Sequence, residues 1–279
     1  MKIIHTIKEL EEFLNPFWLS KKSVGLVPTM GALHRGHLSL VERCRKENTC
    51  AVVSVFVNPT QFNDQTDLAN YPRTLEADCE LLEKYRVDAV FAPTVEEIYP
   101  EPDTRTFSYP PLDQVMEGKF RPGHFNGVCQ VVSKLFMLVK PTKAYFGEKD
   151  YQQLAIVRAM VDDLELGVDV VGCPIVREKD GLALSSRNKL LSPDQREVAL
   201  HISHVLKKSR EVKKEQTVEE TKNYVVKAIE QEPNLKLEYF EIVDGKNLQP
   251  ISSWEQTLQP VGCITVYCGK VRLIDNIQY

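Results

Sequence analysis

Two histidines stand three residues apart in a short segment whose residue types suit a phosphate group. His34 and His37 lie in the stretch 30–37, together with Gly31 and Gly36. Imidazole N–H groups stabilise negative charge that develops on phosphate oxygens, and glycines let the backbone approach a ligand closely. The spacing predicts both rings on the first turn of a helix, directed at one triphosphate. An ordinary helix start or half of a metal site would give the same spacing.

The position of this segment favours the phosphate interpretation. An apolar run at 25–27 precedes it and predicts a buried strand, and the segment continues into a helix predicted over 38–47. In a doubly wound sheet, ligands bind beyond the carboxyl ends of the strands. The free amides and the positive dipole end of the following helix attract phosphate.

Further apolar runs alternate with amphipathic helical patterns through the first two-thirds of the chain. The alternation predicts an α/β fold with a Rossmann-like, doubly wound parallel sheet. One predicted helix covers 73–85, with Pro72 at its first turn and Leu75, Cys79 and Leu82 on one face. A helix near the start of the chain is predicted to have Thr6 as its N-cap and Glu9 in the capping box. The additional strands are predicted at 51–57, 89–92, 144–147 and 168–172.

The pattern changes near residue 176, where we predict a domain boundary. Residues 1–176 would form a nucleotide-binding domain, and 177–279 a smaller α+β lid domain. In the second domain we predict a helix over 193–212 and a helix capped by Thr217 and Glu220. Strands are predicted at 237–243 and 263–273.

Composition limits the classes of partner. The 279 residues carry a net charge of −4, which argues against a large nucleic-acid surface, and no run of about 20 apolar residues predicts a membrane span. The densest basic stretch, 207–214, is interleaved with Glu211 and followed by Glu215, and it predicts a solvated helix face. The seven cysteines form no CxxC pair. They predict buried thiols in a reducing compartment, the cytoplasm.

Six segments together resemble one family. The HxGH pattern after a first strand is the hallmark of the nucleotidyltransferase superfamily, and the flanking words resemble the pantothenate synthetase family in the same order over residues 24–191. The words are PTMGALHRGHLSLV, SVFVNPTQF, YPRTLEAD, RPGHFNGV, AYFGEKDYQQL and DGLALSSRN. The resemblance implies ATP-dependent condensation of (R)-pantoate with β-alanine, by way of a pantoyl-adenylate. It further implies AMP and pyrophosphate as co-products, Mg²⁺ as cofactor and a homodimer.

The resemblance also assigns residues. Catalytic roles fall on His34, His37, Lys149 and Arg187, with His37 as a proton donor. Pantoate contacts fall on Gln61, Gln153 and Asn58, and β-alanine contacts on Gln61. ATP contacts fall on Met30, Gly31, Ala32, Leu33, His34, Arg35, Gly36, His37, Gly147, Glu148, Lys149, Asp150, Val176, Leu184, Ser185, Ser186 and Arg187.

The residue types fit these assignments. Asn58 and Gln61 offer amides that bind hydroxyls or a carboxylate without adding charge, although Asn and Pro also form ordinary turns. Lys149 suits the α-phosphate, with Asp150 as a possible helix N-cap. Ser185, Ser186 and Arg187 suit the departing phosphates, in the place of a mobile loop in the wider superfamily. A polar linker is the plain alternative.

Several alternatives stay open. Arg121 and His124 are a loop ion pair or site residues. Asp78 is by resemblance a magnesium contact, although surface helical acids are commoner, and we predict no protein metal site. His201 and His204 lack partners for zinc. The loop 63–70 departs from the family wording, which leaves a lid role there open. An adenylyltransferase and an inactive nucleotide-binding module are rival functions, and a tRNA synthetase would need a basic surface.

Overall fold

The chain folds as two compact units. The computed structural model describes residues 1–279, with side chains described for 1–64 and 66–279. The first unit comprises 1–109, 120–148 and 156–174, and the second comprises 110–119, 149–155 and 175–279. The chain therefore passes into the second unit at residue 175, near the boundary predicted at 176 and 177. The two earlier segments of the second unit were not predicted, because contacts with distant strands place them there.

The first unit is built on a parallel sheet of six strands within the described residues. The strand order is β1-β4-β3-β2-β5-β6, and every pairing is parallel. The predicted doubly wound parallel sheet is confirmed, with β1 added at its edge. A strand of three residues is too short for a periodic pattern to reveal. The strands are β1 (Lys2–Ile4), β2 (Val24–Thr29), β3 (Cys50–Val55), β4 (Ala89–Phe91), β5 (Lys143–Gly147) and β6 (Asp169–Cys173).

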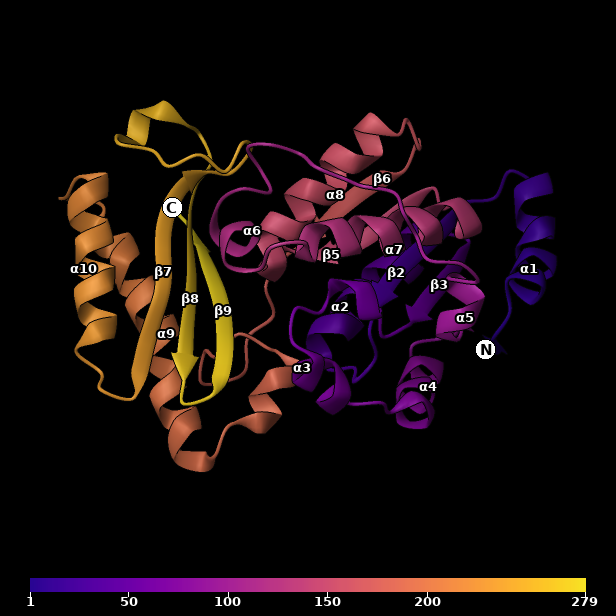
Figure 1. The fold of residues 1–279 in the computed structure, drawn as a ribbon, viewed down its shortest axis with the longest axis horizontal. Helices are drawn as coiled ribbons and strands as arrows, with labels where there is room; N and C mark the ends of the chain where they lie inside the picture. Colours follow the sequence, from indigo (N-terminus) through magenta and orange to yellow (C-terminus); the bar gives the residue numbers. More distant parts are fainter. The chain divides into compact units, whose positions relative to one another are not determined.

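Helices cover both faces of this sheet. Helices α2 (Arg35–Glu47) and α4 (Leu75–Lys84) share one apolar cluster with alternate residues of the central strands. Helix α7 (His124–Val139) packs against β2 and against α1 (Ile7–Leu19), whose Trp18 donates a hydrogen bond to the Val139 carbonyl. In Figure 1, α2 and α4 lie on one side of β2 and β3 and α7 lies on the other. Burial on both faces explains why these strands are continuous apolar runs.

Local signals set most helix starts. Thr6 and Glu9 form the predicted capping box of α1. The start predicted for α4 was too early, since the helix begins at Leu75 with Thr74 as N-cap and leaves Pro72 outside it. The predicted loop 63–70 contains α3 (Gln65–Asn70), capped by Asp64. The first unit also holds α5 (Val95–Ile98) and the 3₁₀ helix η1 (Pro59–Gln61).

The second unit has an antiparallel sheet in the order β7-β8-β9. Helices α9 (Pro193–Val212) and α10 (Val218–Glu230) pack on it around one apolar cluster. The predicted bounds of α9 and the predicted cap of α10, Thr217 with Glu220, are confirmed. The strand predicted over 263–273 was wrong, because Gly269 takes a left-handed conformation, with φ of +58°, and divides it into two strands. The strands are β7 (Leu235–Asp244), β8 (Pro260–Cys268) and β9 (Val271–Gln278).

Two helices and three 3₁₀ helices complete the chain, and η2 (Glu148–Asp150) is one of the latter. Helix α8 (Tyr151–Asp163) begins in the second unit and continues in the first. The others are α6 (Met116–Phe120) and the 3₁₀ helices η3 (Ser186–Leu190) and η4 (Trp254–Gln256). Leu112 and Met116 pack in an apolar cluster with residues of β7 and β8, which is why the segment 110–119 belongs to the second unit.

The cysteines are buried thiols, as predicted. All seven are unbonded and buried, with at most 7% of any of them exposed. Burial raises the pKa of both Cys44 and Cys50 to about 12, which keeps these side chains neutral. In the described part of the chain, no helix combines the length and the apolar character that crossing a membrane requires.

Candidate functional site

The turn between β2 and α2 is held in an unusual backbone conformation. Gly31 and Ala32 have φ values of +80° and +51°, in the left-handed region. The Thr29 hydroxyl donates to the Ser54 carbonyl at 2.7 Å and accepts the amide N–H of Gly31 at 3.2 Å. The turn is therefore fastened to β3 at its first residue, and its conformation brings the chain directly into the start of α2.

The Asp78 carboxylate, on α4, also holds this turn in place. Its carboxylate accepts the amide N–H of Ala32 at 2.9 Å, that of Leu33 at 2.8 Å and the Thr74 hydroxyl at 3.1 Å. The side chain is only 2% exposed. The expectation of a surface helical acid was therefore wrong, because two backbone amides draw this carboxylate into the protein. Its oxygens are engaged in orienting the turn.

The two histidines meet at the first turn of α2. His34 is the N-cap, and its Nδ1 accepts the amide N–H of Gly36 at 3.1 Å, while Nδ1 of His37 accepts the amide N–H of His34 at 3.3 Å. The rings are stacked with centroids 4.1 Å apart. An imidazole nitrogen that accepts a hydrogen bond carries no proton, so each neutral ring holds its proton on Nε2. Both neutral rings thus carry their proton on Nε2.

Asn58 braces the turn that carries Gln61. Asn58 is 1% exposed, and its amide nitrogen donates to the Gly127 carbonyl and to Oε1 of Gln61, at 3.1 and 3.2 Å. Its oxygen accepts the Tyr99 hydroxyl at 2.9 Å. These contacts engage the amide with the protein itself. Asn58 consequently orients Gln61, whose own amide nitrogen contacts the Met30 sulfur at 3.2 Å and so reaches the histidine segment.

His124 holds the same turn from the first turn of α7. An arginine only donates, so Arg121 donates to Nε2 of His124 at 3.1 Å, and the ring proton lies on Nδ1. That Nδ1–H donates to the backbone carbonyl of Gln61 at 2.8 Å. The open question about this pair is answered in part. Arg121 and His124 interact with each other, and through His124 they position Gln61.

Gly127 lets α7 approach this turn closely. A Cβ atom at residue 127 would lie 2.4 Å from the Thr60 carbonyl oxygen and 2.7 Å from the Gln61 amide nitrogen. Such contacts are far inside van der Waals separation. Gly127, Tyr99 and the anchoring role of Asp78 escaped sequence reasoning. Each acts on residues far away in the chain, and single-sequence spacing carries no signal of that.

The second unit holds the other predicted segments. Lys149 lies in the 3₁₀ turn η2 (Glu148–Asp150), and its backbone carbonyl accepts the Asn276 side-chain amide at 3.0 Å. The Leu184 amide donates to the Val176 carbonyl at 3.0 Å, and the Ser185 hydroxyl caps η3 by accepting the Arg187 amide at 3.2 Å. Gln153 is half-buried in the first turn of α8. Gly147 ends β5 and Glu148 follows it directly, and both residues belong to the first unit.

His201, one of the remaining pair of histidines, has a structural role. Nε2 of His201 lies 2.8 Å from the Ala228 carbonyl, to which it must donate, so this nitrogen is engaged between α9 and α10. Among the described residues, no group of three or more His, Cys, Asp or Glu side chains could hold a metal ion. The zinc alternative therefore has no structural support.

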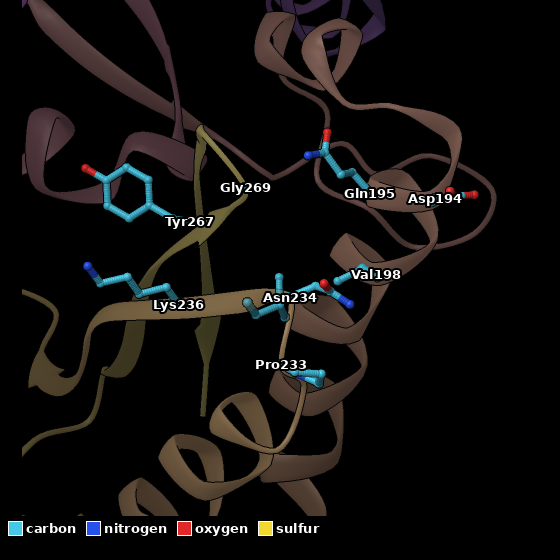
Figure 2. A pocket seen from close by; sticks show the side chains of 9 residues that line it. Asp194, Gln195, Val198, Pro233, Asn234, Lys236, Tyr267 and Gly269 are labelled. Carbon is cyan, nitrogen blue, oxygen red and sulfur yellow. The ribbon is translucent and has the colours of Figure 1, made fainter.

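One hollow of the second unit lies away from these segments. Its volume is about 540 Å³, and Figure 2 shows its lining residues at the start of α9, at the start of β7 with the residues before it, and at the end of β8 with the turn that follows. The described residues that line it include no predicted site residue. They are Asp194, Gln195, Val198, Pro233, Asn234, Leu235, Lys236, Tyr267 and Gly269.

The first unit defines a class of protein. A doubly wound parallel sheet whose central strand leads through a fastened turn into a helix start with paired imidazole donors is typical of nucleotide-binding α/β proteins. The structure brings Met30, His34, His37 and Gln61 into one region of that unit. Lys149 and the segment Ser185–Arg187 lie in the second unit.

Comparison with known proteins identifies the family. A family model described as pantoate–β-alanine ligase matches residues 2–278. The pantothenate synthetase of Bacteroides thetaiotaomicron is 66% identical over 279 residues, covering 100% of this chain and 99% of that protein. The pantothenate synthetase of Thermotoga petrophila is 47% identical and covers 99% of both chains.

Solved structures agree with these sequences. The crystal structure of pantothenate synthetase from Thermus thermophilus has a TM-score of 0.94 and 48% identity, covering 100% of this chain and 99% of that one. A Francisella tularensis pantoate–β-alanine ligase, complexed with β,γ-ATP and β-alanine, has a TM-score of 0.82 and 36% identity, with coverages of 100% and 97%. The chain belongs to the pantoate–β-alanine ligase family. It is therefore a ligase, and the resemblance found in the motifs is confirmed.

Proposed function

We propose that this chain condenses (R)-pantoate with β-alanine in two steps driven by ATP. In the first step a pantoate carboxylate oxygen bonds to the α-phosphorus of ATP, and the bond to the departing pyrophosphate breaks. In the second, the β-alanine amine attacks the acyl carbon, AMP leaves, and pantothenate forms. Family membership supports the overall reaction. The activation step follows from chemistry, because a free carboxylate has no adequate leaving group for attack by an amine.

The observation that carries the proposal is the fixed pair of imidazole donors. His34 and His37 present Nε2–H groups at the amino-terminal end of α2, where the helix dipole adds positive potential. Negative charge spreads over the phosphate oxygens as the carboxylate attacks in line. Donors that are already oriented need no reorganisation at that moment, so they favour the transition state over the ground state.

The His37 tautomer, with its ring proton on Nε2, limits what this side chain can do in proton transfer. The resemblance makes it a proton donor, and a ring that holds its proton on Nε2 suits donation. The β-alanine amine, with a pKa near that of lysine at about 10.4, is mostly protonated at neutral pH and must lose a proton before it attacks. We propose that water takes this proton, because Nδ1 of His37 is engaged with the His34 amide.

We propose that Gln61 binds both pantoate and β-alanine and that Gln153 binds pantoate. Gln61 is held by contacts at its backbone and at its side chain, from His124 and Asn58, which supports a binding residue with a defined orientation. Asn58 then acts on pantoate through Gln61, since its own amide is engaged inside the protein.

We propose that the second unit supplies the remaining phosphate ligands. Lys149 stabilises the α-phosphate, and Arg187 binds the departing phosphates with Ser185 and Ser186 through charge-assisted hydrogen bonds. In this scheme 177–279 acts as a lid. The backbone contacts to the nucleotide fall on 30–37, 147–150, 176 and 184.

We propose that Mg²⁺ arrives as part of the MgATP substrate. Asp78, the acid that the resemblance suggested, has its carboxylate engaged by two backbone amides and the Thr74 hydroxyl, which does not fit a metal ligand. When bound with ATP, the ion would neutralise phosphate charge. His34, His37, Lys149 and Arg187 act on the oxygens that remain.

We further propose that the enzyme is a cytoplasmic homodimer. The buried, unbonded cysteines support a reducing compartment. The dimer rests on the family resemblance, and sedimentation equilibrium of the full chain would test it.

The decisive experiment is isotope exchange between pyrophosphate and ATP with β-alanine omitted. We expect label to enter ATP only when pantoate is present. Labelled pyrophosphate becomes part of ATP only when the pantoyl-adenylate reacts backwards, and that intermediate forms only from pantoate. An adenylyltransferase, which leaves AMP on its product, would need an acceptor other than pantoate and would show no exchange with pantoate alone. An inactive nucleotide-binding module would bind ATP without any exchange. Absence of pantoate-dependent exchange in folded protein would remove the two-step scheme.

A further inference from the structure

Two segments of the second unit are tied to consecutive residues of β9. The Asn276 side-chain amide donates to the backbone carbonyl of Lys149 at 3.0 Å. The Asp275 carboxylate accepts two hydrogen bonds from the Arg177 guanidinium, at 2.7 and 2.9 Å. Successive side chains of a strand point to opposite faces. One short stretch of β9 therefore holds the lysine segment through one side chain and Arg177 through the next.

These ties are built into the interior of the unit. Asp275 and Asn276 are 6% and 4% exposed. The Asp275 carboxylate also accepts the backbone amide of Asn276 at 2.7 Å, and Arg177 donates to the Asn276 backbone carbonyl at 3.3 Å. A bidentate guanidinium–carboxylate pair shielded from water is geometrically specific. The arrangement has little freedom to slide.

Arg177 leads directly to the serine–serine–arginine segment. Residues 177–183, which we call the Arg177 hairpin, are closed by an antiparallel bridge between Arg177 and Ala183. Arg177 also donates to the Gly181 carbonyl inside the hairpin, at 3.2 Å. The Asn188 side-chain amide donates to the Ala183 carbonyl at 3.0 Å, which fastens the middle of η3 to the hairpin. A displacement of Arg177 would therefore be transmitted to Arg187.

The opposite side of the hairpin is held by α9. Arg196 pairs with Glu178 at 3.0 Å and also contacts the Asp180 carboxylate. The hairpin thus has one charged anchor on β9 and another on α9. The anchor on β9, Asp275, is adjacent in the strand to Asn276, which contacts the Lys149 backbone.

We propose that Asp275 and Asn276 are positioning residues that set the Lys149 backbone and the Ser185–Arg187 segment relative to each other. The inference rests on the proposed roles of Lys149 and Arg187 in phosphate transfer. A displacement of about 1 Å between groups that act on one reacting phosphate lowers rates by about 100-fold. Two phosphate-binding segments without a common anchor would be free to make such displacements.

The primary test is Asn276→Ala, measured by pantoate-dependent exchange of pyrophosphate into ATP. We expect the maximal exchange rate to fall about 10-fold, while the KM for pantoate changes less than about 2-fold, because Lys149 is misplaced without losing its charge. A parallel melting curve shows whether the variant is folded.

A double-variant cycle separates positioning from a general loss of structure. In a Lys149→Ala background, Asn276→Ala should lower exchange by less than about 2-fold, because no ammonium is left to position. Asp275→Asn should behave likewise in an Arg187→Ala background. If Asn276 and Asp275 only stabilise the fold, the losses multiply instead, which would overturn the proposal.

Two further variants keep the test decisive. Ser209→Ala removes the hydrogen bond between Ser209 and the Tyr279 hydroxyl, beyond the end of β9, and should leave exchange within about 2-fold of wild type. If Asp275→Asn leaves Arg177 too poorly compensated to fold, Arg177→Met with Asp275→Leu removes both charges at once. That pair should be folded and slow in exchange.

The outcomes distinguish the inference from the function on which it rests. A wild-type enzyme without pantoate-dependent exchange would remove the proposed function. Normal exchange in wild type together with normal exchange in Asn276→Ala, or in the folded Arg177→Met, Asp275→Leu pair, would remove the positioning role alone.

Discussion

The histidine segment 30–37 of the first unit and the segment Ser185–Arg187 of the second are fixed in different ways. The histidines are oriented by hydrogen bonds within four residues of each other, and the turn before them is fastened by one carboxylate, Asp78. The segment Ser185–Arg187 is reached through a hairpin whose main anchor, Asp275, lies about ninety positions further along the chain. Local orientation therefore characterises the first segment, and long-range anchoring the second.

This difference predicts how each segment fails when it is altered. In the first, removing the functional ring should abolish its contribution while the rest of the turn remains in place. In the second, residues that never approach the substrate should matter nearly as much as the charged groups that do. The tests below compare the two segments, beginning with the functional groups.

The largest effects should follow loss of a phosphate ligand in either unit. We expect His37→Ala and Lys149→Ala each to lower turnover at least about 100-fold, the lower range for removing one charge-stabilising group. Steady-state formation of AMP, with pantoate and β-alanine both present, is the measurement. Lys214→Ala, in an exposed part of the second unit, controls for the change of charge. Turnover close to wild type in either test variant would exclude that residue from the mechanism.

Asp78→Asn should have the next largest effect. The amide can accept one of the two backbone N–H groups but presents its own donor to the other, and a buried unsatisfied group costs about 1–3 kcal/mol. We expect the free energy of unfolding to fall by about that amount, and turnover to fall roughly 10-fold through movement of His34. Urea unfolding and AMP formation are the measurements.

Magnesium titration of the same variant tests the alternative role. A lost metal ligand would be compensated at high Mg²⁺ concentration, whereas a displaced turn would not. We expect no recovery of turnover in Asp78→Asn as Mg²⁺ is raised. Recovery would restore Asp78 as a metal ligand and contradict its role as an anchor of the turn.

The sequence predicted the elements that depend on local pattern. The buried strands, the caps of α1 and α10, the bounds of α9 and the pairing of His34 with His37 all follow from periodicity or from spacings of three residues. It failed where a single residue divides an element, as at Gly269, and where an edge strand is very short, as in β1.

The sequence also carried no indication of residues that position the site through partners far away in the chain. Asp78 resembles a surface acid until the amides of Ala32 and Leu33 are placed beside it. Asn276 lies more than a hundred residues from Lys149 in the sequence. Nothing in residue type or spacing connects such pairs, because only the folded sheet brings them together.

Gly127→Ala tests the packing that sets Gln61. The new methyl group would meet the Thr60 carbonyl at 2.4 Å, so α7 and the turn must separate. We expect the KM for pantoate to rise roughly 5-fold with a smaller change in kcat, because substrate binding is perturbed more than phosphate chemistry. Val131→Ala, which removes atoms from the same helix, serves as the control and should leave this KM unchanged. An unchanged KM in Gly127→Ala would show that the turn tolerates the displacement.

The smallest expected effect concerns the stability of the first unit in acid. The Arg105 guanidinium hydrogen-bonds to Asp103 and lowers the pKa of that carboxyl to about 2, with a backbone hydrogen bond and Lys134 adding to the effect. A carboxyl whose pKa is lower in the folded state stabilises the protein above its unfolded pKa, near 4, and loses that contribution as pH falls towards 2.

Asp103→Asn removes this titrating carboxyl. The free energy of unfolding of wild type should therefore exceed that of the variant most at pH 5, and the difference should shrink as pH falls. Urea unfolding of both proteins between pH 5 and pH 2.5, followed by tryptophan fluorescence, measures that difference. The Gln130 side chain on α7 donates to the backbone carbonyls of Asp103 and Arg105, and the Arg105 guanidinium donates to the Gln130 carbonyl. The loss of stability in acid should therefore begin in the first unit. A difference that stays constant through this range would mean that Asp103 keeps its ordinary pKa, and the ion pair would then contribute nothing to the acid sensitivity of the region that carries Gln61.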